Sequence, residues 1–169
     1  MSRQIATFVL GKTLLGLDIL LVKEVYRGVS TTPIPDAPEQ IRGLMNLRGR
    51  VVTVMDLNTC LNRQTSEKGT ENYLLILKTD EEIKGYQKKG DLAGISLGDD
   101  IAGFLIDQMD DVIEVETGEI LPSPPNLEEV EAKLVEGIIK KGDLLVILLD
   151  ITAVLESVMK VMKDEKTNT

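Results

Sequence analysis

The sequence predicts a mainly β protein, built as two small β lobes of similar construction. Of its 169 residues, 43% are apolar but only 3% are aromatic, so the core must consist of Val, Ile and Leu. These residues favour strands where their runs are short, and most apolar runs here end at glycine, proline or acidic turns. A third observation is that two segments of the first half return in the second half. A chain of this length suits one domain or two small lobes.

The first part of the chain predicts three strands and a rigid connection. The strands are expected over 5–10, 14–19 and 22–27, the first two forming a hairpin. The third alternates apolar and polar residues, which is typical of a half-buried strand. Three prolines within 32–38 predict an extended connection rather than a central strand. Asp36 is expected to cap a short helical turn over 38–41.

The stretch 43–57, GLMNLRGRVVTVMDL, organises the rest of the prediction. Its right half, 51–57, is a buried strand, and we expect a turn over 58–62. Its left half holds Arg48 beside Gly49, which predicts a cation at a tight turn where glycine allows close backbone approach. Two interpretations stay open: a surface arginine on a hairpin, or a binding residue on a rigid loop.

The second part of the chain predicts six more strands and two helices. Strands are expected over 73–77, 92–97, 101–106, 112–115, 135–139 and 144–149, and turns over 98–100 and 107–111. Residues 64–71 and 78–91 are polar, and the second of these segments predicts a long exposed loop or mobile hairpin tip. Asn126 predicts a helix cap before 127–135. Apolar residues at helical spacing between Ile151 and Met162 predict a C-terminal helix over 151–163.

The internal repeat has two parts. Residues 11–25 align with 98–112, and residues 43–57 align with 137–151, in the same order along the chain. The approximate halves are 5–62 and 72–151, within a single domain over 1–169. Each half is too small to bury a sheet well alone, so we expect the two to share a face. A crevice between them is a natural binding site.

Composition excludes several chemistries. The chain has no His and a single cysteine, Cys60, so it offers neither a disulfide nor the usual metal-ligand spacing. Cys60 follows a buried strand and is expected to pack as a small apolar side chain. No phosphate loop is present, and the net charge of −9 opposes nucleic-acid binding. We therefore predict no catalysis, no metal and no cofactor. The sequence shows no signal peptide or spanning segment, which indicates a cytoplasmic protein.

Four segments together resemble the CheW family of chemotaxis coupling proteins, over about residues 4–160. They are FVLGKTLLGLDILLVKEV (8–25), TPIPDAPEQIRGLMNLRGRVVTVMDL (32–57), GFLIDQMDDV (103–112) and GDLLVILLDI (142–151). The NLRG turn with its following strand is the most specific of these motifs. The resemblance implies two intertwined five-stranded β-barrels of SH3-like build, with a few short helices and a C-terminal helix.

By resemblance, the function is that of a non-enzymatic adaptor that links the signalling tips of chemoreceptors to the regulatory domain of the histidine kinase CheA. Such a protein would reach the membrane only through its receptors. The matching motifs imply receptor contacts at Val22, Glu24, Arg48 and Gly49, with Glu24 and Arg48 paired across a groove. The family's kinase contact uses apolar barrel edges, and our candidates for it are Ile101 and Phe104.

The resemblance leaves alternatives open. The family usually has a tight hairpin where this chain carries 78–91, so about a dozen residues are inserted, and near the kinase edge they could tune or block that contact. A scaffold of a non-chemotactic signalling or motility pathway would have the same fold. A ligand-binding or enzymatic barrel would instead carry a bound small molecule or metal. Nucleic-acid binding is opposed by the charge and by the scarcity of stacking aromatic residues.

Overall fold

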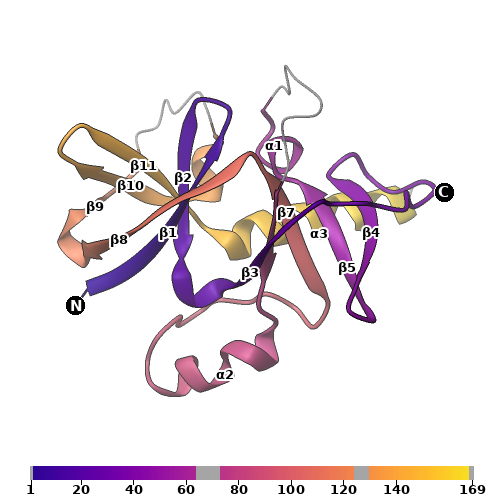
Figure 1. Ribbon diagram of the computed structural model, residues 1–169, viewed down its shortest axis with the longest axis horizontal. Coiled ribbons are helices and arrows are strands. Elements are labelled where there is room, and N and C mark those ends of the chain that lie inside the picture. The colour runs from indigo at the N-terminus through magenta and orange to yellow at the C-terminus, as the bar shows by residue number, and fades with distance from the viewer. Residues whose placement is uncertain (1, 64–72, 124–129, 168–169) are drawn as a thin grey trace.

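A computed structural model describes residues 2–63, 73–123 and 130–167, with backbone only from residue 163 (Figure 1). Two β-sheets form most of it. The six-stranded sheet has, in spatial order, β8 (Gln108–Glu116), β1 (Ser2–Leu10), β2 (Thr13–Asp18), β11 (Leu144–Leu149), β10 (Val135–Lys141) and β9 (Ile120–Leu121). The five-stranded sheet has β3 (Val22–Arg27), β6 (Tyr73–Leu77), β7 (Ile101–Ile106), β5 (Arg50–Asp56) and β4 (Ile41–Leu47).

The chain starts in one sheet, passes through the other and returns: β1, β2 and β8 to β11 form the six-stranded sheet, and β3 to β7 form the five-stranded one. β2 pairs in parallel with β11, and β5 pairs in parallel with β7, whereas the other strand pairs are antiparallel. The β2–β11 contact joins the two ends of the chain, and the β5–β7 contact joins two strands from its middle. The mainly β, intertwined fold is confirmed, and the sixth strand of the larger sheet is the two-residue β9.

Both sheets curl until strands from their opposite sides meet. In the five-stranded sheet, β3 and β4 are the two edges, yet a side chain of β3 forms an ion pair with the turn that follows β4. In the six-stranded sheet, Lys141 at the end of β10 donates to the backbone carbonyl of Glu114 in β8. Edge strands that are drawn together in this way leave less unpaired backbone exposed.

Three apolar cores follow from this curling. Alternate residues of β6 point to opposite sides: Leu74 and Ile76 face the inside of the five-stranded sheet, whereas Leu75 and Leu77 face the space between the sheets. We call the latter space the interface core. It also receives side chains from three helices. A smaller core, which includes Val146 and Leu148 of β11, fills the inside of the six-stranded sheet.

Two helices begin at an aspartate directly after a strand. Asp56 ends β5 and accepts a hydrogen bond from the Thr59 N–H (3.2 Å) at the start of α1 (Leu57–Cys60). Asp150 follows β11 and accepts one from the Ala153 N–H (3.1 Å) at the start of α3 (Ile151–Thr167). The C-terminal helix is thus confirmed. It lies against the interface core through Ile151, Val154, Leu155 and Val158.

Glycines at matched positions of the aligned segments have matched surroundings. A Cβ at Gly43 in β4 would lie 2.4 Å from the Thr32 carbonyl oxygen, and one at Gly137 in β10 would lie 2.7 Å from that of Leu121. In each case the backbone of an earlier segment lies against the strand at this point. These contacts support our proposal that the halves 5–62 and 72–151 are repeats.

The prediction of a loop over 78–91 is wrong, because a helix, α2 (Asp80–Lys88), occupies most of it. The Glu82 carboxylate accepts a hydrogen bond from the Thr79 N–H (3.0 Å), and three acidic residues occupy the first turn. These features complement the helix N-terminus. Ile83 is fully buried and holds the helix on the interface core. The sequence Thr-Asp-Glu-Glu at 79–82 is a capping-box signal that the interpretation as a loop overlooked.

Several smaller predictions are corrected. Residues 92–97 are irregular rather than a strand, because the Gln87 side chain binds the carbonyls of Leu92 and Ile95 (3.2 and 3.1 Å). The predicted turn at 107–111 lies largely within β8, and that at 58–62 largely within α1. Residues 38–41 form a turn without a helix. The remaining short elements are 3-10 turns: η1 (Ile19–Leu21), η2 (Thr117–Glu119) and η3 (Ala132–Leu134).

Two predictions fall partly or wholly outside the described residues. The predicted loop at 64–71 lies there entirely. Of the predicted helix over 127–135, the described part holds only η3 and the first residue of β10. The strands predicted around 5–10, 14–19, 22–27, 73–77, 101–106, 135–139 and 144–149 are confirmed, with ends shifted by a few residues.

Candidate functional site

The turn between β4 and β5 holds Arg48 in a fixed conformation. Arg48 and Gly49 have φ angles of +53° and +81°, which is the left-handed pair of a two-residue type I′ hairpin turn. The Gly49 N–H donates to the Asn46 side-chain oxygen (3.0 Å). This turn matches the twist of the flanking strands, so it presents the arginine from a rigid support.

Glu24 reaches this turn from the opposite edge of the same sheet. It lies in β3 directly after a bulge, where the pairing with β6 shifts between Val22 and Glu24. Arg48 Nη1 donates to Glu24 Oε2 and Nη2 to Oε1, both at 2.9 Å. This planar, two-bond contact is the geometry that arginine favours with carboxylates. The predicted pairing of Glu24 and Arg48 is therefore confirmed.

The pair lies at the surface and is open to a partner. The Arg48 side chain is 69% exposed and that of Glu24 is 25% exposed, so solvent screens their attraction. Hydrogen bonds from Arg48 hold the pKa of Glu24 below its ordinary value of 4.5. A lowered carboxyl pKa means that the ionised pair is complete above that ordinary value and is lost as the pH falls through the lowered one. At neutral pH both charges are present.

The strands that carry the pair and its turn also expose aliphatic side chains. Val22 is half-buried and packs on the interface core. Val51, three residues after Arg48, is 60% exposed, and Leu44 and Val25 are 36% and 37% exposed. A charged pair among exposed aliphatic side chains is suited to binding another protein. The structure thus brings Glu24, Arg48 and Gly49 together, with Val22 on the same strand as Glu24.

Ile101 and Phe104 do not form the exposed apolar edge that we expected. Phe104 is 1% exposed and lies in the interface core, and Ile101 is 9% exposed and lies inside the five-stranded sheet. β7 is the central strand of that sheet, so both of its faces are covered. This corrects the candidate kinase contact, because neither side chain has surface to offer a partner.

A cavity of about 510 Å³ lies apart from the Glu24–Arg48 pair. It opens between the start of β1, the first turn of α3 and residues 90–95. Arg3 lines it, and its guanidinium binds both Asp18 (3.2 Å) and Glu136 (2.6 Å). Since the cation is already neutralised by these two carboxylates, the cavity has a structural ion-pair network rather than an evident ligand site.

Metal ligation, membrane spanning and thiol reactivity can each be checked in the described part of the chain. No group of three or more His, Cys, Asp or Glu side chains there could hold a metal ion. Within the same residues, no helix has the length and apolar content needed to cross a membrane. Burial, together with nearby Asp56, raises the pKa of the Cys60 thiol to about 12, which leaves it protonated and a poor nucleophile at neutral pH.

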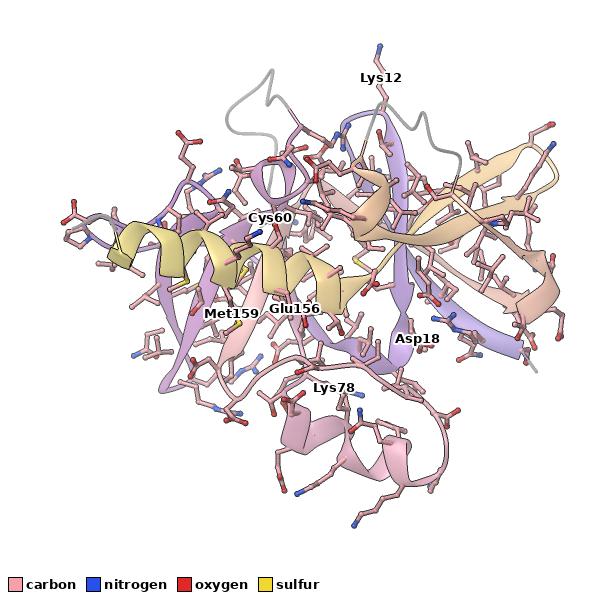
Figure 2. All side chains as sticks on the ribbon, turned by 180° about the vertical axis from the view of Figure 1, so that it is seen from behind. Lys12, Asp18, Cys60, Lys78, Glu156 and Met159 are labelled. Atoms are coloured by element: carbon pink, nitrogen blue, oxygen red, sulfur yellow. The ribbon has the colours of Figure 1, made fainter. Side chains whose placement is uncertain are left out.

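We predict that Cys60 in the folded protein resists a maleimide or a disulfide reagent at pH 8. The thiol is 3% exposed in the interface core, near α3 in Figure 2, and it is the chain's single cysteine. Labelling followed by mass spectrometry should show a slow reaction in buffer and a complete one in denaturant. Rapid labelling of the native protein would contradict this burial.

Comparison with known proteins gives a consistent picture. Residues 4–159 match the family described as CheW-like domain. The chain is 30% identical over 150 residues to the chemotaxis protein CheW of Treponema pallidum, covering 88% of this chain and 79% of the relative. It is 25% identical over 156 residues to CheW of Klebsiella aerogenes, covering 92% and 83%.

A solved structure agrees with these relatives. The scaffolding protein TtCheW from Thermoanaerobacter tengcongensis has a TM-score of 0.71 and 30% identity, covering 91% of this chain and 88% of that one. The likeness thus extends over nearly the whole chain in both sequence and fold.

Proposed function

The chain belongs to the CheW family of chemotaxis proteins, and on that premise we propose that it couples chemoreceptors to the histidine kinase CheA. Family members are scaffold adaptors rather than enzymes. Coupling requires two separate contacts, one with the signalling tip of a receptor and one with the regulatory domain of the kinase. We place this work in the cytoplasm, with the membrane reached only through the receptors.

The observation that carries the proposal is the Glu24–Arg48 pair on its rigid turn. A receptor tip is a helical hairpin, so the expected mode is docking of a helix against a surface with apolar and charged parts. Val25, Leu44 and Val51 offer exposed apolar area on β3, β4 and β5, the strands that carry the pair and its turn. Arg48, held by Gly49 and Glu24, would set the register of the helix through a charged or carbonyl contact. Val22 begins β3 and attaches that strand to the interface core through its side chain.

We assign the kinase contact to exposed apolar residues of the six-stranded sheet, one in an edge strand and one in an inner strand. Val112 in the edge strand β8 is 52% exposed, and Leu145 in β11 is 57% exposed. Both belong to strands away from the Glu24–Arg48 pair. Two separate surfaces would allow one molecule to hold receptor and kinase at once, as coupling requires.

The experiment is a calorimetric titration of this protein with the kinase regulatory domain from the same genome, followed by addition of the receptor tip. We expect both to bind, and the second to bind the complex formed by the first. Binding of the kinase domain without the receptor tip, or of the tip without the kinase domain, would contradict coupling. Binding of neither by the folded protein would direct attention to the scaffold of a non-chemotactic pathway.

A further inference from the structure

Helix α2 and the segment that follows it form a firmly attached unit over residues 79–98. The Asp80 carboxylate accepts hydrogen bonds from the N–H groups of Leu97 (2.7 Å) and Gly98 (3.1 Å), which closes the unit on itself. The Ser96 N–H donates to Thr152 in α3 (3.0 Å). Ile83 is fully buried in the interface core. The unit therefore has a defined position, which a recognition surface requires.

The unit is also attached to β3, the strand that carries Glu24. The Lys23 ammonium in β3 binds the Glu82 carboxylate at 2.8 Å. Directly before the unit, the Lys78 N–H donates to the carbonyl of Leu21, the residue before β3, at 2.9 Å. Burial would raise the pKa of Glu82, but hydrogen bonds from Lys23 and Thr79 outweigh it and lower that pKa. In Figure 1, α2 lies below the sheets, on the side toward which the β4–β5 hairpin points.

The C-terminal half of α2 and the residue after it present three exposed lysines, although the chain as a whole carries a net charge of −9. Lys84, Lys88 and Lys89 are all exposed. Lys84 and Lys88 are one helical turn apart and share a face. Lys84 lies 3.4 Å from the exposed Glu81, a contact that solvent screens, and the described residues provide no ion pair for Lys88 or Lys89. We call these three residues the lysine patch.

We propose that the lysine patch is a second contact surface for the receptor tip, and that it recognises acidic side chains on the same helical hairpin that meets Arg48. This inference rests on the proposed function. The patch belongs to a unit that is ion-paired to β3, the strand that carries Glu24, so an elongated helical partner docked at Arg48 would extend over α2. An acidic helix complements the positive patch and is repelled by most of the remaining surface.

The test compares two triple variants that change the net charge equally. The first is Lys84→Gln, Lys88→Gln and Lys89→Gln. The control is Lys12→Gln, Lys140→Gln and Lys160→Gln, which removes three other exposed lysines; Lys12 lies at the opposite end of the molecule from α2 (Figure 2). Association with the receptor tip is measured by surface plasmon resonance at low and high salt. Circular dichroism verifies that both variants fold.

We expect the first variant to associate about tenfold more slowly at low salt and the control to behave as the native protein, because charges at an interface rim act mainly on association. The difference should shrink at high salt. An equal effect of both variants, no effect of either, or a loss confined to kinase binding would overturn the inference. If the native protein itself does not bind the receptor tip, the proposed function fails as well, so the two failures are distinguishable.

Discussion

Arg48→Glu is expected to leave the protein folded and to remove measurable binding of the receptor tip. The side chain is 69% exposed and packs on none of the three cores, so its loss costs little stability. The substitution places a carboxylate opposite Glu24, which repels it, and withdraws the cation that we assign to the receptor. The loss of a docked charge is compounded by repulsion, so we expect the affinity to fall by about a hundredfold or more, to where binding is no longer detected. Calorimetric titration measures this.

Two controls separate a binding role of Arg48 from a structural one. Arg50→Glu makes the same charge change at an exposed position two residues away and should bind the receptor nearly as well as the native protein. The double variant Glu24→Arg, Arg48→Glu rebuilds the ion pair with its polarity reversed. If the pair only closes the sheet, this swap restores binding. We expect binding to stay lost, and full recovery would show that Arg48 does not contact the receptor.

The sequence predicts the strands of this fold well because glycine and acidic turns separate them. Gly43 and Gly137 mark the two aligned hairpins, and the same alignment pairs Asp56 with Asp150, each of which starts a helix. The parallel pairing of β2 with β11 is a contact between the ends of the chain. No local pattern encodes such a contact, and the intertwining could be inferred only from the family resemblance.

Helix α2 was missed for a different reason. The segment is rich in charge and has two glycines, which suggests a solvated loop, and only Ile83 in it is fully buried. Its stability depends on distant contacts: Lys23 with Glu82, and Asp80 with the backbone at 97–98. The capping signal at Thr79 and Glu82 was the available local evidence. Composition alone therefore underestimates helices whose support comes from other segments.

In the candidate site too, the local sequence predicts some features, and others depend on contacts between distant segments. Arg-Gly at a hairpin turn is a local signal, and it correctly predicts the conformation of Arg48. Its pairing with Glu24 joins opposite sheet edges and came from the resemblance. The prediction of a kinase contact at Phe104 is wrong because the run Ile-Ala-Gly-Phe-Leu-Ile at 101–106 is apolar throughout. A run without polar residues is typical of a central strand that is buried on both faces. The sequence therefore favours a buried Phe104 ring over one that contacts a partner.

Phe104→Ala is therefore expected to act on stability rather than on recognition. The ring is 1% exposed in the interface core, and truncating a buried phenylalanine costs about 3–5 kcal/mol of unfolding free energy. The free energy of unfolding of such domains is about 5–15 kcal/mol in total, so the variant should lose a large part of its stability. Urea unfolding followed by circular dichroism measures the loss.

Binding of the kinase domain by the fraction that remains folded distinguishes the two roles. Phe104→Leu keeps most of the apolar volume, so it should stay folded and bind the kinase domain as the native protein does. Val112→Asp changes a side chain that is 52% exposed, so it should leave stability nearly unchanged and weaken kinase binding. A stable Phe104→Leu variant that no longer binds the kinase domain would show that the ring becomes accessible in the complex. Burial in the unbound protein would then be a poor guide to this interface.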